Sequence, residues 1–340
     1  MDGVGAGAAL ASLAAPYNLL AQALDRPRRL LASALTRYVH PEALVKAGAR
    51  KPALLTTAVV LAGGRGTRLY PLTEHLPKPL VPVFGRALLD HLLTGLARSG
   101  VQQVYILLGF GGEQVLNHLA EAAPAGLAIE TLSGNEPYGT AGATRRLRKL
   151  LPDEFLVMCG DALTDADFLH ATLFHQNQGA LVTVLAKEVP DASQFGLMAV
   201  DETRRITDFV EKPARLPGFP TPSGLVSCGM YLMRREALDY VPAGVEYDFG
   251  KQLLPSLLEA GAPLYAWSLP QYWRDIGTWE AYVQGMMDVL EGQVRLPWPL
   301  LCEKIFLLRQ RLARGRFDLP AHPAAAIATL EAEFATLAAR

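Results

Sequence analysis

The chain has 340 residues, half of them hydrophobic, and its 32 lysines and arginines nearly balance 33 aspartates and glutamates. This length can bury one large α/β core with an appendage, and the near-zero net charge gives no electrostatic footprint for a polyanion, so we expect no nucleic-acid partner. Cys159, Cys228 and Cys302 fit neither a disulfide framework nor a zinc site, which indicates a reducing cytoplasm.

Residues 1–52 are predicted to form a helical N-terminal extension. Its leucines are interrupted by the charged run from Asp25 to Arg29, a pattern that favours a packed helix; an amphipathic helix on a membrane surface is the alternative. The uncharged stretch from Gly3 to Leu24 has no basic segment before it. We therefore expect neither a signal peptide nor a membrane span.

From Thr56 onward, short apolar runs alternate with segments of helical period. TTAVVLA, VYILLGF and FLVMCGD are typical of buried strands, and Ala87–Arg98 and Glu113–Ala122 have the period of helices. The series continues through LVTVLA, GMYLMR and PLYAWSL and stops near Gly292. It predicts an α/β domain over residues 53–292 with a Rossmann-like, mainly parallel, twisted sheet, which binds ligands beyond the carboxyl ends of its strands.

Residues 293–340 are predicted to form a helical C-terminal extension. Leu300–Leu312 and Ala324–Ala338 have helical periods and flank a turn at Pro320. These helices can cap the domain or contact a partner, so we expect any homo-oligomer to assemble through the helical extensions.

A glycine-rich segment, LAGGRGTRLYPLTEHLPKPL, follows the first predicted strand. Its three glycines let the backbone approach a ligand and turn amides toward phosphate oxygens, and its basic residues add positive charge. A Walker loop is excluded because Gly-Lys-Ser/Thr is missing, and a dinucleotide fingerprint because Leu69 stands where its third glycine would be. A tight strand-to-helix turn also needs glycine, but the prolines flanking Lys78 indicate a charge that is aimed at a ligand.

Several blocks along the chain together resemble the nucleotidyltransferases that make NDP-sugars. These blocks are GGRGTRLYPLT with PKPL, GNEPYGTAGA, CGDALTD, DFVEKP, GLVSCGMYLM, DFGKQLLPSLLEAG and YWRDIGTWEAY. Each is a modest match alone, but their order is that of the family, from about Thr56 to Leu290. The resemblance implies transfer of a nucleotidyl group from an NTP to a hexose 1-phosphate, with release of pyrophosphate.

The resemblance also implies residue roles, which the matching positions carry over. The catalytic set is Arg68, Lys78, Asp161, Lys212 and Asp275. The nucleotide-binding set is Leu61, Ala62, Gly63, Gly64, Gly66, Thr67, Glu136, Gly139 and Thr140. The sugar-binding set is Gly142, Glu211 and Ser227. Asp161 and Asp275 would hold Mg²⁺, because two carboxylates at a phosphate site need a hard dication between them.

The residues taken alone leave plainer interpretations open. Asp161 follows an apolar strand and could cap a turn, Glu211 and Lys212 could be a solvated pair, and GTAGA could be an ordinary helix start. His75 is the only histidine within the motifs, and no activated serine or cysteine accompanies it. This fits a phosphate nucleophile, which needs no general base.

Among subfamilies, PKPL, GTAGA, DFGKQLLP and YWRDIGT most resemble the mannose-1-phosphate guanylyltransferases. The expected substrates are therefore GTP and mannose 1-phosphate, and the product is GDP-mannose. Glu136 suits this choice, because a carboxylate can accept from guanine N1–H and the exocyclic amine, whereas adenine N1 is itself an acceptor.

Other functions stay open. Glucose-1-phosphate adenylyl-, uridylyl- and thymidylyltransferases are alternatives, as are a non-catalytic nucleotide-sugar-binding relative and a hydride-transferring dinucleotide enzyme. Ser227 departs from the family, which has Asn-x-Gly here, so the resemblance leaves the sugar selectivity open. The tail is also too short and too rich in alanine and leucine for the left-handed β-helix that many relatives carry.

Overall fold

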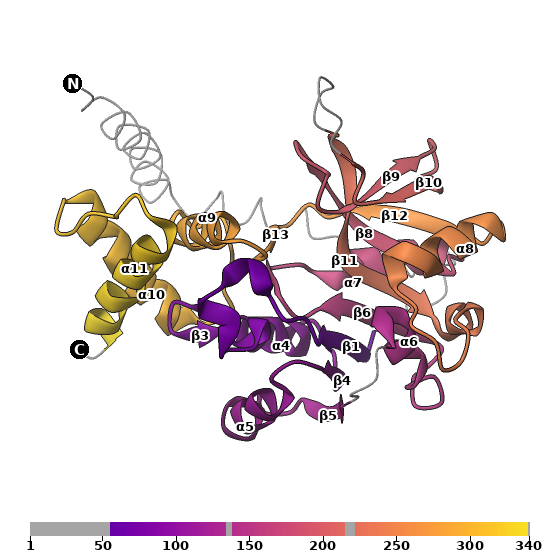
Figure 1. Ribbon diagram of the computed structural model, residues 1–340, viewed down its shortest axis with the longest axis horizontal. Coiled ribbons are helices and arrows are strands. Elements are labelled where there is room, and N and C mark those ends of the chain that lie inside the picture. Colours follow the sequence, from indigo (N-terminus) through magenta and orange to yellow (C-terminus); the bar gives the residue numbers. More distant parts are fainter. Residues whose placement is uncertain (1–54, 134–137, 215–221, 339–340) are drawn as a thin grey trace, which may run out of the picture. The chain divides into compact units, whose positions relative to one another are not determined.

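The computed structural model describes residues 55–133, 138–214 and 222–338 (Figure 1). Contacts divide the chain into two units, and the larger one comprises Leu54–Phe306 with Leu319–Arg340. The predicted N-terminal extension lies outside the described residues. Within the described part of the chain, no helix is long and apolar enough to cross a membrane.

The larger unit is built on a nine-stranded sheet. One half of it is parallel, with the spatial order β6 (Glu154–Cys159), β1 (Thr57–Ala62), β4 (Gln103–Leu108) and β5 (Ala128–Ser133). The other half consists of β11 (Gly224–Arg234), β8 (Val182–Val189), β9 (Gly196–Val200), β10 (Ile206–Glu211) and β12 (Leu264–Ser268). In this half β11 runs antiparallel to β6, β8 and β9, while β12 runs parallel to β8.

Two small sheets and a set of helices complete the described fold. The small sheets pair β2 (Pro82–Val83) with β3 (Arg86–Ala87), and β7 (Ala162–Thr164) with β13 (Trp273–Asp275). The α-helices are α4 (Leu88–Arg98), α5 (Gly112–Ala122), α6 (Gly139–Arg145), α7 (Phe168–Asn177), α8 (Leu254–Glu259), α9 (Trp279–Leu290), α10 (Pro299–Ala313) and α11 (Pro323–Ala338). Single turns of 3₁₀ helix span Thr67–Leu69, Leu72–Glu74 and Lys78–Leu80, a longer one spans Arg235–Tyr240, and a π-helix spans Phe249–Leu253.

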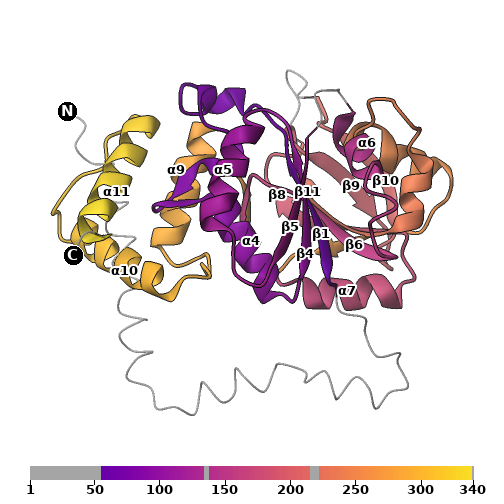
Figure 2. The same ribbon diagram turned by 90° about the horizontal axis from the view of Figure 1, so that it is seen from below.

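The parallel strands β1, β4 and β6 are buried on both faces, as expected for a sheet with crossover helices, whereas β5 at the edge is exposed or half-buried. Successive residues of a strand point to opposite faces, so Val59 enters one apolar cluster and Val60 the other. Figure 2 shows α4 and α5 on one face of this sheet and α6 on the other. Burial of both faces, at about 25 cal/mol per Å² of apolar surface, stabilises the layers.

The expected Rossmann-like fold class is confirmed, and so are the two predicted C-terminal helices, which correspond to α10 and α11. The chain leaves β1 for β4 and β5 on one side and later returns to add β6 on the other side. Connections therefore diverge beside the carboxyl end of β1, which is where open α/β sheets bind ligands. The glycine-rich segment begins at this point.

Candidate active site

Within the glycine-rich segment, the glycine turn at Gly66 packs directly on Lys78. Gly66 has a φ of 63°, and a Cβ there would lie 3.2 Å from the Cβ of Lys78. The hydroxyl of Thr73 donates to the carbonyl of Gly66 over 2.6 Å, which closes the segment on itself. Gly63 and Gly64 are exposed just beyond β1. Of the predicted nucleotide-binding residues here, Leu61 and Ala62 end the strand and Thr67 is exposed.

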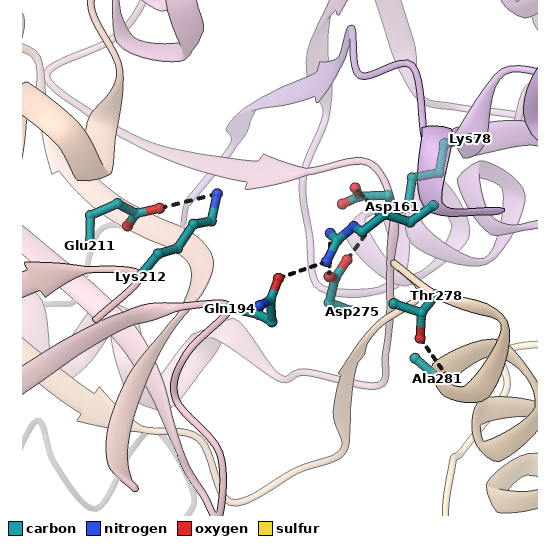
Figure 3. Close-up of polar contacts among 9 residues, drawn as sticks. Lys78, Asp161, Gln194, Glu211, Lys212, Asp275, Thr278 and Ala281 are labelled. Atoms are coloured by element: carbon teal, nitrogen blue, oxygen red, sulfur yellow. Dashed lines mark hydrogen bonds and ion pairs between the residues drawn. The ribbon is translucent and has the colours of Figure 1, made fainter. Parts of the chain in front are cut away.

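Lys78 is the centre of an ion-pair cluster. It begins a 3₁₀ turn after Pro77, and its side chain is only 8% exposed. Its Nζ lies 2.6 Å from Oδ2 of Asp161 and 3.0 Å from Oδ1 of Asp275 (Figure 3). Three of the residues predicted as catalytic are therefore in direct contact, although 197 positions separate Lys78 from Asp275.

A small antiparallel sheet brings the two carboxylates together. Asp161 lies two residues beyond β6 and directly before β7, while Asp275 is the last residue of β13. The pairing of β7 with β13 places Ala162 opposite Asp275, and the amide of Ile276 donates to the carbonyl of Asp161 over 3.3 Å. The carboxyl end of β6 is thus extended into a second strand pair that carries both acids.

The charges of this cluster are coupled. Burial acts to lower the pKa of Lys78, but Asp161 and Asp275 outweigh it, so that pKa is raised above its usual value. Burial, and then the charge of Asp161, raise the pKa of Asp275, and Lys78 only partly opposes them. One buried cation thus faces two carboxylates, and this site favours additional positive charge.

The donor set fits a magnesium ion. Asp161 and Asp275 supply hard oxygen ligands, and both keep part of their surface exposed. Within the described residues, no group of three or more His, Cys, Asp or Glu side chains is arranged to hold a metal ion. Mg²⁺ needs no such cage, because it commonly takes one or two carboxylates and completes its shell with phosphate oxygens and water.

Arg68 lies at the rim of the cluster. One guanidinium nitrogen is 4.0 Å from Oδ2 of Asp275, and another donates to Oε1 of Gln194 over 3.1 Å. Gln194 belongs to the segment between β8 and β9 and was not predicted from the sequence. Its hydrogen bond to Arg68 joins residues that are 126 positions apart, so no local sequence pattern could have predicted the contact.

Glu211 and Lys212 form a second, more open group at the end of β10. Lys212 is 57% exposed, and its Nζ lies 3.5 Å from Oε1 of Glu211. The carboxylate of Glu211 rests against the backbone, because a Cβ on Gly250 would come within 2.4 Å of its Oε2. In Figure 3 this pair is drawn apart from the Lys78 cluster, with Gln194 between them in that view.

The thiol of Cys159, at the end of β6, links the two groups electrostatically. Its pKa is raised first by burial, and then by the carboxylates of Asp161, Asp275 and Glu211. Acids from both groups therefore act on the same buried atom.

The predicted loop at Gly139 and Thr140 is anchored by an acid that the sequence did not single out. Gly139 has a φ of 65°, and a Cβ there would lie 2.7 Å from the amide nitrogen of Tyr247. The amide and the hydroxyl of Thr140 both donate to Oδ1 of Asp248, over 2.9 and 3.1 Å. Burial acts to raise the pKa of Asp248, but these bonds and Lys251 lower it overall. Asp248 lies in the DFGKQLLP block, which was its only signal.

Of the remaining predicted residues, Gly142 and Ser227 are buried. The amide of Gly142 donates to the carbonyl of Tyr247 over 2.9 Å, and its backbone is buried. Ser227 is also buried, and its hydroxyl accepts from the amide of Gly229 and donates to the hydroxyl of Tyr231. Glu136 lies outside the described residues. Roles of these three residues in binding stay predictions.

Comparisons with known proteins place this geometry in a family. Residues 57–292 match the family model described as nucleotidyl transferase. The chain is 32% identical over 70% of its length to a UTP–glucose-1-phosphate uridylyltransferase of Synechocystis, and 34% identical over 69% to a mannose-1-phosphate guanylyltransferase of Mycobacterium tuberculosis. It covers 64% and 65% of those two proteins, so it spans somewhat less than two thirds of their length.

A solved structure is similar as well. The crystal structure of HddC from Yersinia pseudotuberculosis superposes with a TM-score of 0.59 at 25% identity, covering 69% of this chain and 99% of that one. The family match extends from the first residue of β1 to just beyond α9, and so includes the Lys78 cluster, the Glu211 pair and the Thr140 loop. The chain belongs to the nucleotidyl transferase family.

Proposed function

We propose that this protein transfers a nucleotidyl group from an NTP to a hexose 1-phosphate, giving an NDP-sugar and pyrophosphate. The observation that carries the proposal is the buried Lys78, bonded to Asp161 and Asp275 directly beside the glycine-rich segment. An ammonium group has three N–H donors, so one remains for a phosphate oxygen after the two carboxylates are served. The two carboxylates outnumber this cation, so the site would neutralise and orient phosphates together with a bound dication and with Arg68 at its rim.

The nucleophile in this reaction is the sugar phosphate itself. The second pKa of a phosphate monoester is about 6, so the group is largely dianionic at neutral pH and needs no base to remove a proton. The difficulty is electrostatic, because a dianion must approach a triphosphate that is already negative. Catalysis then rests on positioning and on charge neutralisation.

The chain's residues can divide this task. The exposed backbone of Gly63 and Gly64 permits close approach of the triphosphate, and Arg68 would neutralise the departing pyrophosphate. Lys78 would hold the α-phosphate, and Lys212 would receive the sugar phosphate. Asp161 and Asp275 would hold Mg²⁺, which when bound supplies charge neutralisation at the phosphates.

The direct test is pyrophosphate release from the full chain, with each common NTP crossed with glucose, mannose and N-acetylglucosamine 1-phosphates. We expect release to require both substrates, and mass spectrometry to identify the matching NDP-sugar. Release that does not depend on the sugar phosphate would indicate a hydrolase instead. A chain that binds both ligands without releasing pyrophosphate would be the non-catalytic relative.

Within that class we propose GTP and mannose 1-phosphate as the substrates. The support is the likeness of the sequence blocks to the guanylyltransferases and the base-reading chemistry of a carboxylate at Glu136. Relatives of similar identity include a uridylyltransferase named for UTP and glucose 1-phosphate, so the same matrix of substrates must decide between the two pairs.

Glu136→Gln tests the base assignment. An amide keeps one acceptor but adds a donor that can meet adenine N1. The free-energy preference for GTP over ATP, calculated from the ratio of the two kcat/KM values, should therefore fall by about 1 to 3 kcal/mol. The melting temperature serves as the control and should not change. An unchanged ratio with lower thermal stability would show that Glu136 supports the loop and does not read the base.

A further inference from the structure

The hairpin that follows Lys78 contains a turn that its own sequence does not favour. β2 and β3 pair Val83 with Arg86, which leaves Phe84 and Gly85 as a two-residue turn. Their φ angles are 50° and 72°. A turn with two positive φ values is normally made by Asn-Gly or Asp-Gly, and a bulky residue pays a steric cost in the left-handed region. Such a conformation persists when surrounding groups hold it.

The C-terminal helix α11 supplies those groups. The carboxylate of Glu331 accepts from the amide of Phe84 through Oε1 over 2.8 Å, and from the amide of Gly85 through Oε2 over 3.0 Å. The ring of Phe84 is fully buried and meets the ring of Phe334 edge to face, with the centroids 5.5 Å apart. Both turn residues are thus bound to a helix that begins more than two hundred positions later.

Glu331 is not an ordinary surface acid. It lies on the helix between Ile327, Leu330 and Phe334, all of which are buried. Burial raises its pKa, and its two bonds to backbone amides work in the opposite direction. A carboxylate among buried apolar residues is costly unless its oxygens are satisfied, so this position is explained by the turn that it binds.

A short segment with backbone hydrogen bonds at both of its ends connects the hairpin to Lys78. The amide of Val81 donates to the carbonyl of Lys78 over 3.1 Å, and the amide of Leu88 donates to the carbonyl of Val81 over 3.0 Å. On the other side, the hydroxyl of Tyr282 in α9 donates to the carbonyl of Pro82. These bonds form a short, continuous path through which a movement of the turn can reach Lys78.

We infer that Glu331 is a positioning residue for Lys78, acting through the hairpin at Phe84 and Gly85. The C-terminal helix then belongs to the support of the active site, although the family match ends at residue 292. This inference rests on the proposed function, because Lys78 must sit correctly only if it orients phosphates. A shift of about 1 Å at such a group can cost up to a hundredfold in rate.

The test compares Glu331→Gln with Glu303→Gln in the full chain. Glu303 is an exposed glutamate in the same C-terminal segment, so its variant removes the same charge without touching the turn. We expect Glu331→Gln to lower kcat by about tenfold or more while both KM values stay within about twofold, and Glu303→Gln to leave all three parameters within about twofold.

Hydrogen exchange of the same proteins without substrate gives a second measurement. In Glu331→Gln, exchange should accelerate at the amides of Phe84 and Gly85 and spread to those of Val81 and Leu88. If this variant does not fold, Phe334→Leu loosens the same turn from its other contact and should give the same loss of kcat and the same spread of exchange.

A lowered melting temperature with unchanged kcat at temperatures where the variant is folded would overturn the inference, because Glu331 would then only anchor the helix. Faster exchange confined to Phe84 and Gly85 would overturn it as well. Failure of the wild-type chain to release pyrophosphate from any substrate pair is a different result. It would overturn the proposed function directly, before any variant is measured.

Discussion

The two lysines of the candidate site differ in how far their charge is already paired with carboxylates of the protein. The amine of Lys78 is buried and has two carboxylates at 2.6 and 3.0 Å, whereas Lys212 is 57% exposed and its only described ionic partner is Glu211 at 3.5 Å. The first group is assembled in advance, and its balance of charge is fixed by the fold. The second group leaves a cation available to an incoming anion.

The backbone of Lys212 supports this contrast. Its φ is 49°, an uncommon value for a residue with a side chain, and its amide donates to the carbonyl of Phe195 over 2.9 Å. Backbone strain of this kind is typical of positions where direction matters more than stability. Side-chain contacts thus hold the amine of Lys78 in place, whereas the backbone conformation of Lys212 sets the direction in which its side chain leaves the chain.

The largest expected effect concerns the assembled group. Asp275→Asn keeps the volume of the side chain but removes an anionic ligand, so pyrophosphate release in Mg²⁺ should fall by about 10²- to 10³-fold. The circular dichroism spectrum should match that of the wild type. Near wild-type rates with an unchanged dependence on Mg²⁺ concentration would eliminate Asp275 as a metal ligand.

Next in size is the loss of stability when the buried lysine is removed. Lys78→Met leaves Asp161 and Asp275 close together without their shared cation. We expect it to lower the free energy of unfolding by about 1 to 3 kcal/mol. This value is smaller than that for a fully buried pair, because both acids are partly exposed.

The matched variant in the open group is Lys212→Met. Its pair with Glu211 is exposed, so the free energy of unfolding should change by less than about 0.5 kcal/mol. Urea unfolding at neutral pH measures both variants. Equal losses of stability in the two proteins would remove the distinction between an assembled and an open group.

Lys212→Met has its own signature in catalysis. The cation that it removes should face the sugar phosphate, so the KM for the hexose 1-phosphate should rise by about tenfold while that for the nucleotide changes little. Lys149→Met is a suitable control, because Lys149 is exposed and precedes the amino end of β6, away from the site. An equal rise in both KM values would place Lys212 elsewhere in the reaction.

The sequence predicted those parts of the fold that have local patterns. Apolar runs gave the approximate positions of β1, β4 and β6, and the glycines after β1 gave the ligand edge of the sheet. β5 was missed because its residues Ala128–Ser133 lack an apolar run, and none of them is buried. The strand β9 was missed as well, and β11 extends five residues before its predicted start.

Contacts between distant segments could not be predicted in the same way. Asp161 was expected at a strand end from its local pattern, but the role of Asp275 followed from family resemblance, since nothing near it predicts the pairing of β13 with β7. The bonds of Gln194 to Arg68 and of Glu331 to Phe84 likewise depend on tertiary structure. A glutamate on the apolar side of a predicted helix was the one signal for the second of these.

The smallest expected effect is a gain of stability in the variant that loses most activity. Burial, and then the charge of Asp161, raise the pKa of Asp275 above its ordinary value of 3.8, so the folded protein holds this proton more tightly than the unfolded chain does. Below pH 3.8 both states carry the proton and nothing is lost. As the pH rises through the raised pKa, the ionised carboxylate costs stability, even with Lys78 beside it.

Asp275→Asn imitates the protonated acid at every pH. Its melting temperature should therefore exceed that of the wild type by about 1 to 3 °C at pH 7, and the difference should shrink as the pH falls toward 4. Asp239→Asn provides the opposite sign, because a hydrogen bond from Arg148 lowers the pKa of Asp239 and its removal should slightly destabilise the protein at pH 7. A lower melting temperature for Asp275→Asn at pH 7 would mean that attraction to Lys78 outweighs burial. The ionised carboxylate of Asp275 would then stabilise the folded protein at pH 7 instead of destabilising it.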